Sequence, residues 1–219
     1  MEKQITALKA QKRNSQRVNV YLDGEFAFGL SRIVAAWLHV GQELSAEKIA
    51  ELKVEDDLEL AYQRAIRYLS YRMRSVFEVQ QHLTQHGINN FVIEDVIERL
   101  QTNGLLDDLS FAQMWIENRN VFRPRSHRMM TIELNQKGIH YNTISQILEE
   151  TISDDVLAYR AAKKQARKYK HLEKQEFRRK LGSFLARRGF SYSIINPVVD
   201  QVWTEQDPES LRVDRDLVP

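Results

Sequence analysis

The sequence lacks cysteine and is poor in glycine and proline. Its 219 residues contain no Cys, 8 Gly and 4 Pro. Without cysteine the chain can form neither disulfides nor thiolate metal sites, and it has no cysteine nucleophile. Few Gly and Pro residues mean few sharp turns, which argues against an all-β sandwich or barrel. The hydrophobic share of 42% and the charged share of 28% are those of a chain that folds.

Long hydrophobic runs are also missing. The first 16 residues carry Lys3, Lys9, Lys12 and Arg13 but no apolar core of the kind that a signal peptide needs. No stretch approaches the roughly 18 apolar residues of a membrane span. We therefore expect a cytoplasmic protein that does not enter a membrane.

No catalytic or cofactor-binding pattern stands out. The glycines are scattered, so that neither a phosphate-binding loop nor a dinucleotide fingerprint is present. His82 and His86 have the i, i+4 spacing of a metal pair but lack the Glu of a His-Glu-x-x-His motif, and a half-exposed helix face accounts for them. Asp107 and Asp108 suit a helix cap better than an acid and base pair. We predict no enzyme activity, no cofactor and no metal.

Charge is segregated along the chain although the total is only +2. Residues 156–192 contain twelve Lys or Arg and two Glu, a local net charge of +10, whereas residues 43–59 sum to −5 and residues 200–216 to −4. A polyanion would be attracted to the basic block and repelled by the acidic segments. The alternative is that the basic block is merely a solvated helical face.

The first 55 residues have a pattern of their own. Apolar residues alternate from Val18 to Leu22, Asp23-Gly24 interrupts them, and the pattern resumes through Phe28, which predicts a β-hairpin that pairs Tyr21 with Phe26. Two short helices are expected to pack against it, one after Ser31 and one after Ser45. We expect residues 1–55 to form a small α+β cap.

A repeat of 51 residues organises the rest of the chain. Gly87, Gly138 and Gly189 have this spacing, and so do Leu83, Leu134 and Leu185. Other apolar positions recur at the same interval: Val79, Met130 and Leu181; Ile88, Ile139 and Phe190; Ile93, Ile144 and Ile195; and Val96, Ile147 and Val198. These matches predict three copies of one unit, with the three leucines buried equivalently.

Each copy is predicted to contain three helices. In the first copy, helical spacing follows Asp56-Asp57, Ser75 and Glu78 form a Ser-x-x-Glu capping box, and Gly87 ends the second helix. The expected copies are residues 57–108, 109–155 and 156–206, followed by an acidic, disordered tail at 207–219. The fold class is therefore mainly α, with three tandem three-helix repeats in an elongated stack behind the N-terminal cap. Pro197 should delay or kink the last helix.

Arginines recur at the junction between the first and second helices. Arg72 and Arg74 precede Ser75, and 51 residues later Arg123 and Arg125 precede Ser126. Arg64 and Arg67 lie upstream, as does Arg119 in the second copy. Arginine forks match phosphate or carboxylate oxygens, so a surface row could follow an acidic partner or a nucleic-acid backbone. The alternative is that these arginines cap helix ends or pair with neighbouring acids.

These motifs resemble those of the RecX family of bacterial regulatory proteins. The resemblance covers about residues 57–206, and the front segment resembles the extension of longer members. It is carried by the following residues: Arg72-x-Arg74-Ser75 with Glu78; Gly104-Leu105-Leu106-Asp107-Asp108 with Phe111-Ala112 and Trp115; Arg119; Arg123-Pro124 with Arg128; Glu133-Leu134-x-x-Lys137-Gly138-Ile139; and, in the front segment, Gln11-Lys12-Arg13 and Val20 to Phe26. The third copy lacks the Arg-x-Arg-Ser element.

The resemblance implies a modulator of the RecA recombinase that acts in homologous recombination, DNA repair and the SOS response. It implies binding in the groove of the RecA filament on single-stranded DNA and suppression of ATPase, strand exchange and coprotease activity. We expect a monomer whose partners are this filament, single-stranded DNA and, without sequence preference, double-stranded DNA. The expected contact residues are Arg72, Arg74, Arg119, Arg123, Arg125, Arg128, Lys137, Arg167, Lys168, Arg187 and Arg188. Two alternatives are a plain nucleic-acid-binding helical repeat protein and a helical scaffold for an unrelated acidic protein.

Overall fold

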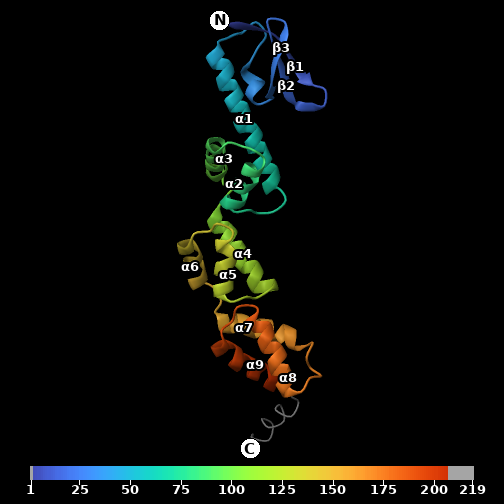
Figure 1. Ribbon diagram of the computed structural model, residues 1–219, viewed down its shortest axis with the longest axis vertical. Coiled ribbons are helices and arrows are strands. Elements are labelled where there is room, and N and C mark those ends of the chain that lie inside the picture. The colour runs from blue at the N-terminus through green and yellow to red at the C-terminus, as the bar shows by residue number, and fades with distance from the viewer. Residues whose placement is uncertain (1, 207–219) are drawn as a thin grey trace, which may run out of the picture. The chain divides into compact units, whose positions relative to one another are not determined.

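The computed structural model describes residues 2–206 of the chain. Its secondary structure is mainly α-helical, with a small sheet at the N-terminal end (Figure 1). The chain divides into two compact units, Met1–Asp107 and Asp108–Pro219. The first unit holds the sheet and the first three-helix repeat, and the second holds the other two repeats.

A four-stranded antiparallel sheet begins the first unit, with the order β3-β2-β1-β4. The strands are β1 (Lys3–Gln11), β2 (Asn14–Leu22), β3 (Glu25–Ser31) and β4 (Glu43–Leu44). The predicted hairpin is confirmed: Tyr21 pairs with Phe26, and Asp23 and Gly24 both have positive φ, as a two-residue turn requires. The strand β1 was not predicted, because a bulge between Ile5 and Ala7 breaks the alternation by which a strand is recognised.

Helix α1 (Ala46–Leu69) corrects the prediction for residues 45–69. Instead of a short helix after Ser45 and a second one after Asp57, one helix of 24 residues begins at the Ser45 cap, so the expected boundary near residue 56 lies within it. Asp56 caps nothing, because its buried carboxylate accepts hydrogen bonds from Arg17 Nη2 and from the backbone N–H of Ser31. The other expected helix is a 3₁₀ turn, η1 (Val34–Trp37). Figure 1 shows α1 running from the sheet into the first repeat.

Two separate cores share α1. Its first half contributes Leu52 to the core of the sheet, with residues such as Ile5 and Leu30. Its second half contributes Ala61 and Ala65 to the core of the first repeat, where it packs with α2 (Val76–Gln85) and α3 (Asn90–Thr102). The long helix thereby joins the cap and the first repeat.

The second unit contains six helices in two sets of three within the described residues. They are α4 (Asp108–Phe122), α5 (His127–Asn135), α6 (Tyr141–Glu149), α7 (Asp154–Ala166), α8 (Lys174–Ala186) and α9 (Tyr192–Gln206). Both sets share one continuous hydrophobic core. The equivalence of the three leucines is confirmed, because Leu83, Leu134 and Leu185 are each 0% exposed.

The start of α9 differs from expectation. It begins at Tyr192, in register with α3 and α6, so Pro197 does not delay it. Pro197 lies in the second turn and is exposed, where its missing N–H leaves the carbonyl of Ser193 without its helical partner. The expected acidic tail, 207–219, lies outside the described residues.

Candidate partner and nucleic-acid interface

Glu78 organises the junction arginines of the first repeat. It completes the capping box of α2 with Ser75, as predicted, and its carboxylate also accepts hydrogen bonds from Arg72 at 2.9 and 3.3 Å. Arg74 lies 4.0 Å from the same carboxylate, and its guanidinium lies 4.0 Å from the centre of the Tyr68 ring. The Arg74 side chain is only 15% exposed, so of the two alternatives the one without a surface role fits this residue.

Glu133 on α5 has the corresponding role in the second repeat. Its side chain is 11% exposed and accepts hydrogen bonds from Arg119, from Arg125 and from the indole of Trp115. The guanidinium of Arg119 and the ammonium of Lys137 also lie 4.7 and 5.6 Å from the centre of the Trp115 ring. Arg119 and Arg125 therefore each donate to an acid inside the repeat, which is the alternative of pairing with a neighbouring acid that the sequence left open.

An arginine cluster forms where the second and third repeats meet within the second unit. Arg188 donates from Nη1 to the carbonyl of Pro124 at 2.8 Å, and the N–H of Ser126 donates to the carbonyl of Arg188 at 3.1 Å. These bonds bring Arg188 beside Arg123 and Arg125. Burial, and then repulsion from those two residues, lowers the pKa of Arg188. With Arg187, which is exposed and adjacent in sequence, they define the arginine cluster, a point of concentrated positive potential.

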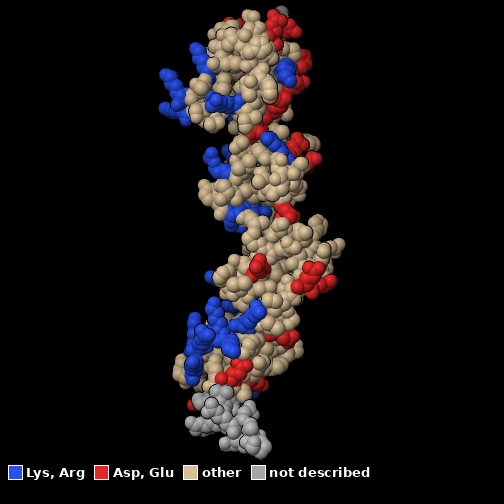
Figure 2. Space-filling view, turned by 180° about the vertical axis from the view of Figure 1, so that it is seen from behind, with Lys and Arg blue, Asp and Glu red and all other residues tan. Residues whose placement is uncertain are grey.

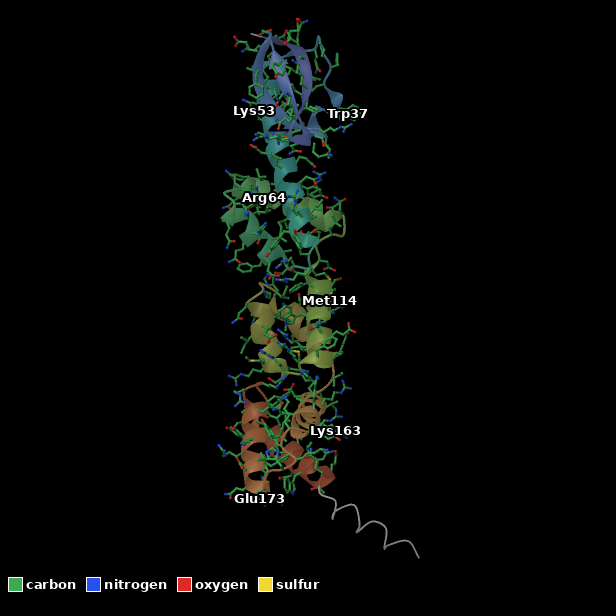
Figure 3. The ribbon with its side chains drawn as sticks, turned by 90° about the vertical axis from the view of Figure 1, so that its right-hand side faces the viewer. Trp37, Lys53, Arg64, Met114, Lys163 and Glu173 are labelled. Carbon is green, nitrogen blue, oxygen red and sulfur yellow. The ribbon has the colours of Figure 1, made fainter. Side chains whose placement is uncertain are left out.

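The basic block of the third repeat is partly neutralised. Four of its cations pair with acids: Lys163 with Glu205 at 3.4 Å, Arg178 with Asp200 at 3.1 Å, and Arg179 and Lys180 with Glu176 at 3.8 and 2.9 Å. Within residues 2–206, no ion pair is recorded for the others, which are Arg160, Lys164, Arg167, Lys168, Lys170, Lys174, Arg187 and Arg188. Figure 2 shows Lys and Arg gathered on one face of this repeat, and Figure 3 labels Lys163 on α7. A polyanion can therefore reach several uncompensated cations.

Within the second unit, the predicted contact residues do not form a single patch. Arg167 and Lys168 follow α7 at the end where α8 begins, whereas Arg187 and Arg188 follow the far end of α8, which is 13 residues or about 20 Å long. Arg128 is exposed on the first turn of α5 and lines a cavity between α5 and α6. The arginine cluster brings Arg188 to the segment around Pro124, which lies 64 positions away in the sequence.

The described residues show no arrangement suited to metal chemistry. Across 2–206, no group of three His, Cys, Asp or Glu side chains could hold a metal ion. His82 stacks on Tyr68, with ring centres 3.9 Å apart, and His86 Nδ1 lies 2.7 Å from the carbonyl of His82. None of the described helices is both long and apolar enough to cross a bilayer.

The fold and these surfaces define a class: a helical protein of tandem three-helix repeats with arginine-rich junctions and an N-terminal sheet. Three family models match successive parts of the chain. They are the regulatory protein RecX N-terminal domain at residues 3–45, the RecX first three-helix domain at 61–100 and the RecX third three-helix domain at 153–199.

Whole-chain comparisons agree. The chain is 34% identical over 207 residues to regulatory protein RecX of Bacillus licheniformis, which covers 93% of this chain and 79% of that protein, and 32% identical to its namesake in Bacillus subtilis, with 94% and 80% covered. A crystal structure of regulatory protein RecX superposes with a TM-score of 0.71 at 28% identity, covering 90% of this chain and 99% of that one. RecX from Lactobacillus salivarius gives 0.58 at 26% identity, with 68% and 97% covered. The chain belongs to the RecX family of regulatory proteins.

Proposed function

We propose that this chain is a non-enzymatic, cytoplasmic regulator that binds the RecA filament on single-stranded DNA as a monomer. It lowers the ATPase, strand-exchange and coprotease activities of RecA. Family membership carries the proposal, because the resemblance to RecX proteins implies this partner. We assign the contacts to the arginine cluster and to Arg167 and Lys168, two exposed cations that directly follow α7.

The arginine cluster supports this assignment through its electrostatic cost. Arg125 and Arg123 repel Arg188, and Glu133 pairs with Arg125 but with neither of the other two. Like charges held this close lose stability unless an anion neutralises them. An acidic protein surface or a phosphate backbone would supply that anion.

The test is the single-stranded DNA-dependent ATPase of the cognate RecA, measured as the chain is added to filaments that are already assembled. The parent protein should lower the rate. Arg123→Glu with Arg187→Glu should abolish most of the inhibition, because both side chains are exposed and neither forms a recorded ion pair with a described acid. Arg72, Arg74, Arg119 and Arg125 are unsuitable for this test, since their removal would disturb Glu78 or Glu133.

The matched control is Arg160→Glu with Lys164→Glu, two exposed cations on α7 that change the net charge equally. Inhibition that survives in the control but not in the cluster variant supports a specific docking point. If the parent leaves the hydrolysis rate of preformed filaments unaffected at every ratio, the regulator proposal is wrong.

A second candidate is simple nucleic-acid binding, favoured by the unpaired cations of the third repeat. A protein that only competes for DNA should inhibit when it is added before RecA and lose its effect on preformed filaments. The two pairs of substitutions should then weaken DNA binding to a similar extent, because non-specific binding depends on the number of cations that contact phosphate and each pair removes two.

A further inference from the structure

A groove runs along α1 in the first unit, far in sequence from the basic third repeat. Two adjoining cavities of about 580 and 300 Å³ make it up. They share Asn14, Leu60, Gln63 and Arg67 as lining residues. The sheet, α1 and α2 all contribute to its walls, so it is a feature of the folded unit.

The groove is lined by cations. Arg64 and Arg67 on α1 and Arg32 after β3 line it, are exposed, and have no recorded ion pair with a described acid. Arg64 is labelled in Figure 3. Arginines free of internal partners keep their donors available for an incoming anion.

The nearby acids are already neutralised inside the unit. Glu59 lines the groove, but its carboxylate pairs with Arg99 at 3.0 Å and accepts from Gln63 at 2.8 Å. Asp56 pairs with Arg17 at 2.9 Å. The charge presented by the groove is therefore positive.

Aromatic rings border the cations. Tyr68 lies between the guanidinium of Arg74, at 4.0 Å, and the parallel ring of His82, at 3.9 Å, and His86 follows at 4.4 Å from His82. At the same wall Tyr71 is 78% exposed and has no recorded ring contact or hydrogen bond in the described residues. A large exposed ring beside free arginines is the combination that holds unstacked bases and their phosphates.

We propose that this groove binds a segment of single-stranded nucleic acid, with phosphates on Arg64 and Arg67 and a base stacked on Tyr71. A single strand fits better than a duplex, because a base must leave its stack to reach the ring of Tyr71. An acidic peptide would pair with the arginines but would not account for the exposed ring of Tyr71 beside them. The site consists of residues of the first unit alone, and the proposed binding does not depend on RecA.

The test is photo-crosslinking of the full chain, without RecA, to a short oligo-dT that carries 5-iododeoxyuridine, with the adducts mapped by mass spectrometry. Adducts are expected at Tyr71 and on the neighbouring histidines. Tyr71→Ala should remove the Tyr71 adduct and weaken binding at this site by roughly tenfold. Arg64→Gln with Arg67→Gln should reduce the salt slope of binding by about 0.7 for each lost contact.

Tyr192→Ala is the matched control, because Tyr192 is 72% exposed on α9 and should leave the first-unit adducts unchanged. Adducts confined to residues 156–192 would overturn the proposal. The binding of a labelled poly-glutamate peptide gives a second test. If the double arginine variant loses the peptide but still binds the oligonucleotide, the proposal is wrong and the groove binds an acidic protein. Circular dichroism melts of each variant check that the fold is intact. Because RecA is absent, a negative result leaves the regulator proposal standing.

Discussion

At the scale of single residues, two carboxylates form ion pairs with several of the arginines that recur at the junctions of the repeats. Glu78 holds Arg72 and approaches Arg74, and Glu133 holds Arg119 and Arg125. A half-buried guanidinium that is already paired contributes mainly to the stability of the fold and offers less to a binding partner. Removing either member of the pair leaves an uncompensated charge. The arginines most available to a partner are therefore those without such an acid, such as Arg123 and Arg187.

Of the two equivalent repeat glycines Gly87 and Gly189, Gly189 should tolerate substitution less. A Cβ at Gly189, where φ is +90°, would lie 2.5 Å from Ser126 Oγ and 3.0 Å from Met129 Cβ, whereas a Cβ at Gly87, where φ is +74°, meets no atom within 4 Å. Gly87→Ala should cost only the strain of positive φ, about 1 to 2 kcal/mol, and Gly189→Ala that strain plus overpacking of about 1 to 3 kcal/mol. Urea unfolding of both variants gives the comparison, and equal losses would contradict the close contact with Ser126.

His82 should make stability fall in mild acid. Burial, followed by repulsion from His86, Arg64 and Arg74, lowers the pKa of His82 in the folded state below its ordinary value of 6.5. As the pH falls below about 6.5 the unfolded chain takes up this proton first, so the free energy of unfolding decreases until the folded pKa is passed. Above that range both states are neutral and His82 contributes nothing to the pH dependence.

Unfolding of His82→Gln between pH 7.5 and 5 should show a flatter decline than that of the parent. His39→Gln, at an exposed histidine outside the repeats, controls for the loss of a histidine as such. An unchanged slope in His82→Gln would contradict the lowering of the pKa of His82 by burial and by the neighbouring cations.

At the scale of elements, α1 shows how one helix can serve two cores. Leu52 packs under the sheet, and Ala61 and Ala65 pack in the first repeat. The mid-helix acids Asp56 and Glu59 pair with Arg17 and Arg99, so each links α1 to a different element. Asp56, which together with Asp57 suggested a boundary in the sequence, instead links the helix to β2, and Glu59 links it to α3.

The three repeat leucines should be equally sensitive to truncation. Leu→Ala at positions 83, 134 or 185 should cost about 2 to 5 kcal/mol, because each side chain is completely buried and its loss leaves a cavity. Leu60→Ala, at a leucine that is 42% exposed, should cost much less. Thermal melts of the four variants test this, and three core variants that melt like the parent would refute the repeat as an energetic unit.

At the scale of the whole molecule, the proposed binding functions depend on where cations without an acidic partner lie. The total charge of +2 conceals a basic third repeat, an arginine cluster at its border and a cationic groove in the first unit. Binding of phosphate releases counterions in proportion to the cations in contact, so salt dependence reports the number of contacts.

Neutralising Arg167, Lys168 and Arg187 to Gln should weaken single-stranded DNA binding. The slope of log affinity against log salt should flatten by about 0.7 per lost contact, or about 2 for all three. The control changes Lys3, Lys48 and Lys53 to Gln, three exposed cations on β1 and α1 that alter the net charge equally. Fluorescence anisotropy over a range of salt measures both, and equal slopes in the two variants would mean that the third-repeat cations are only solvated.

Local order in the sequence was sufficient for much of the fold. The hairpin turn at Asp23-Gly24 and the capping box of Ser75 and Glu78 follow from backbone preferences that act over a few residues. The equivalent burial of Leu83, Leu134 and Leu185 follows from their recurrence every 51 residues. The same reasoning failed at β1, where a bulge breaks the alternation, and at Asp56, where a distant arginine allows an acid to be buried inside a helix.

What only the tertiary structure decided is which of the sequence's many cations remain available. Glu133 pairs with Arg119 and Arg125. Arg188 donates to the carbonyl of Pro124, which lies 64 positions away in the sequence. Tyr68 and His82, whose rings stack, line a groove together with Arg64 and Arg67. Such pairings depend on packing between segments that are far apart in the chain, and hydrophobic periodicity places helices without specifying the polar contacts between them. The sequence by itself determined the repeats and the sign of the charge of each segment. The folded chain determined where the charged side chains lie and which cations pair with acids inside the fold.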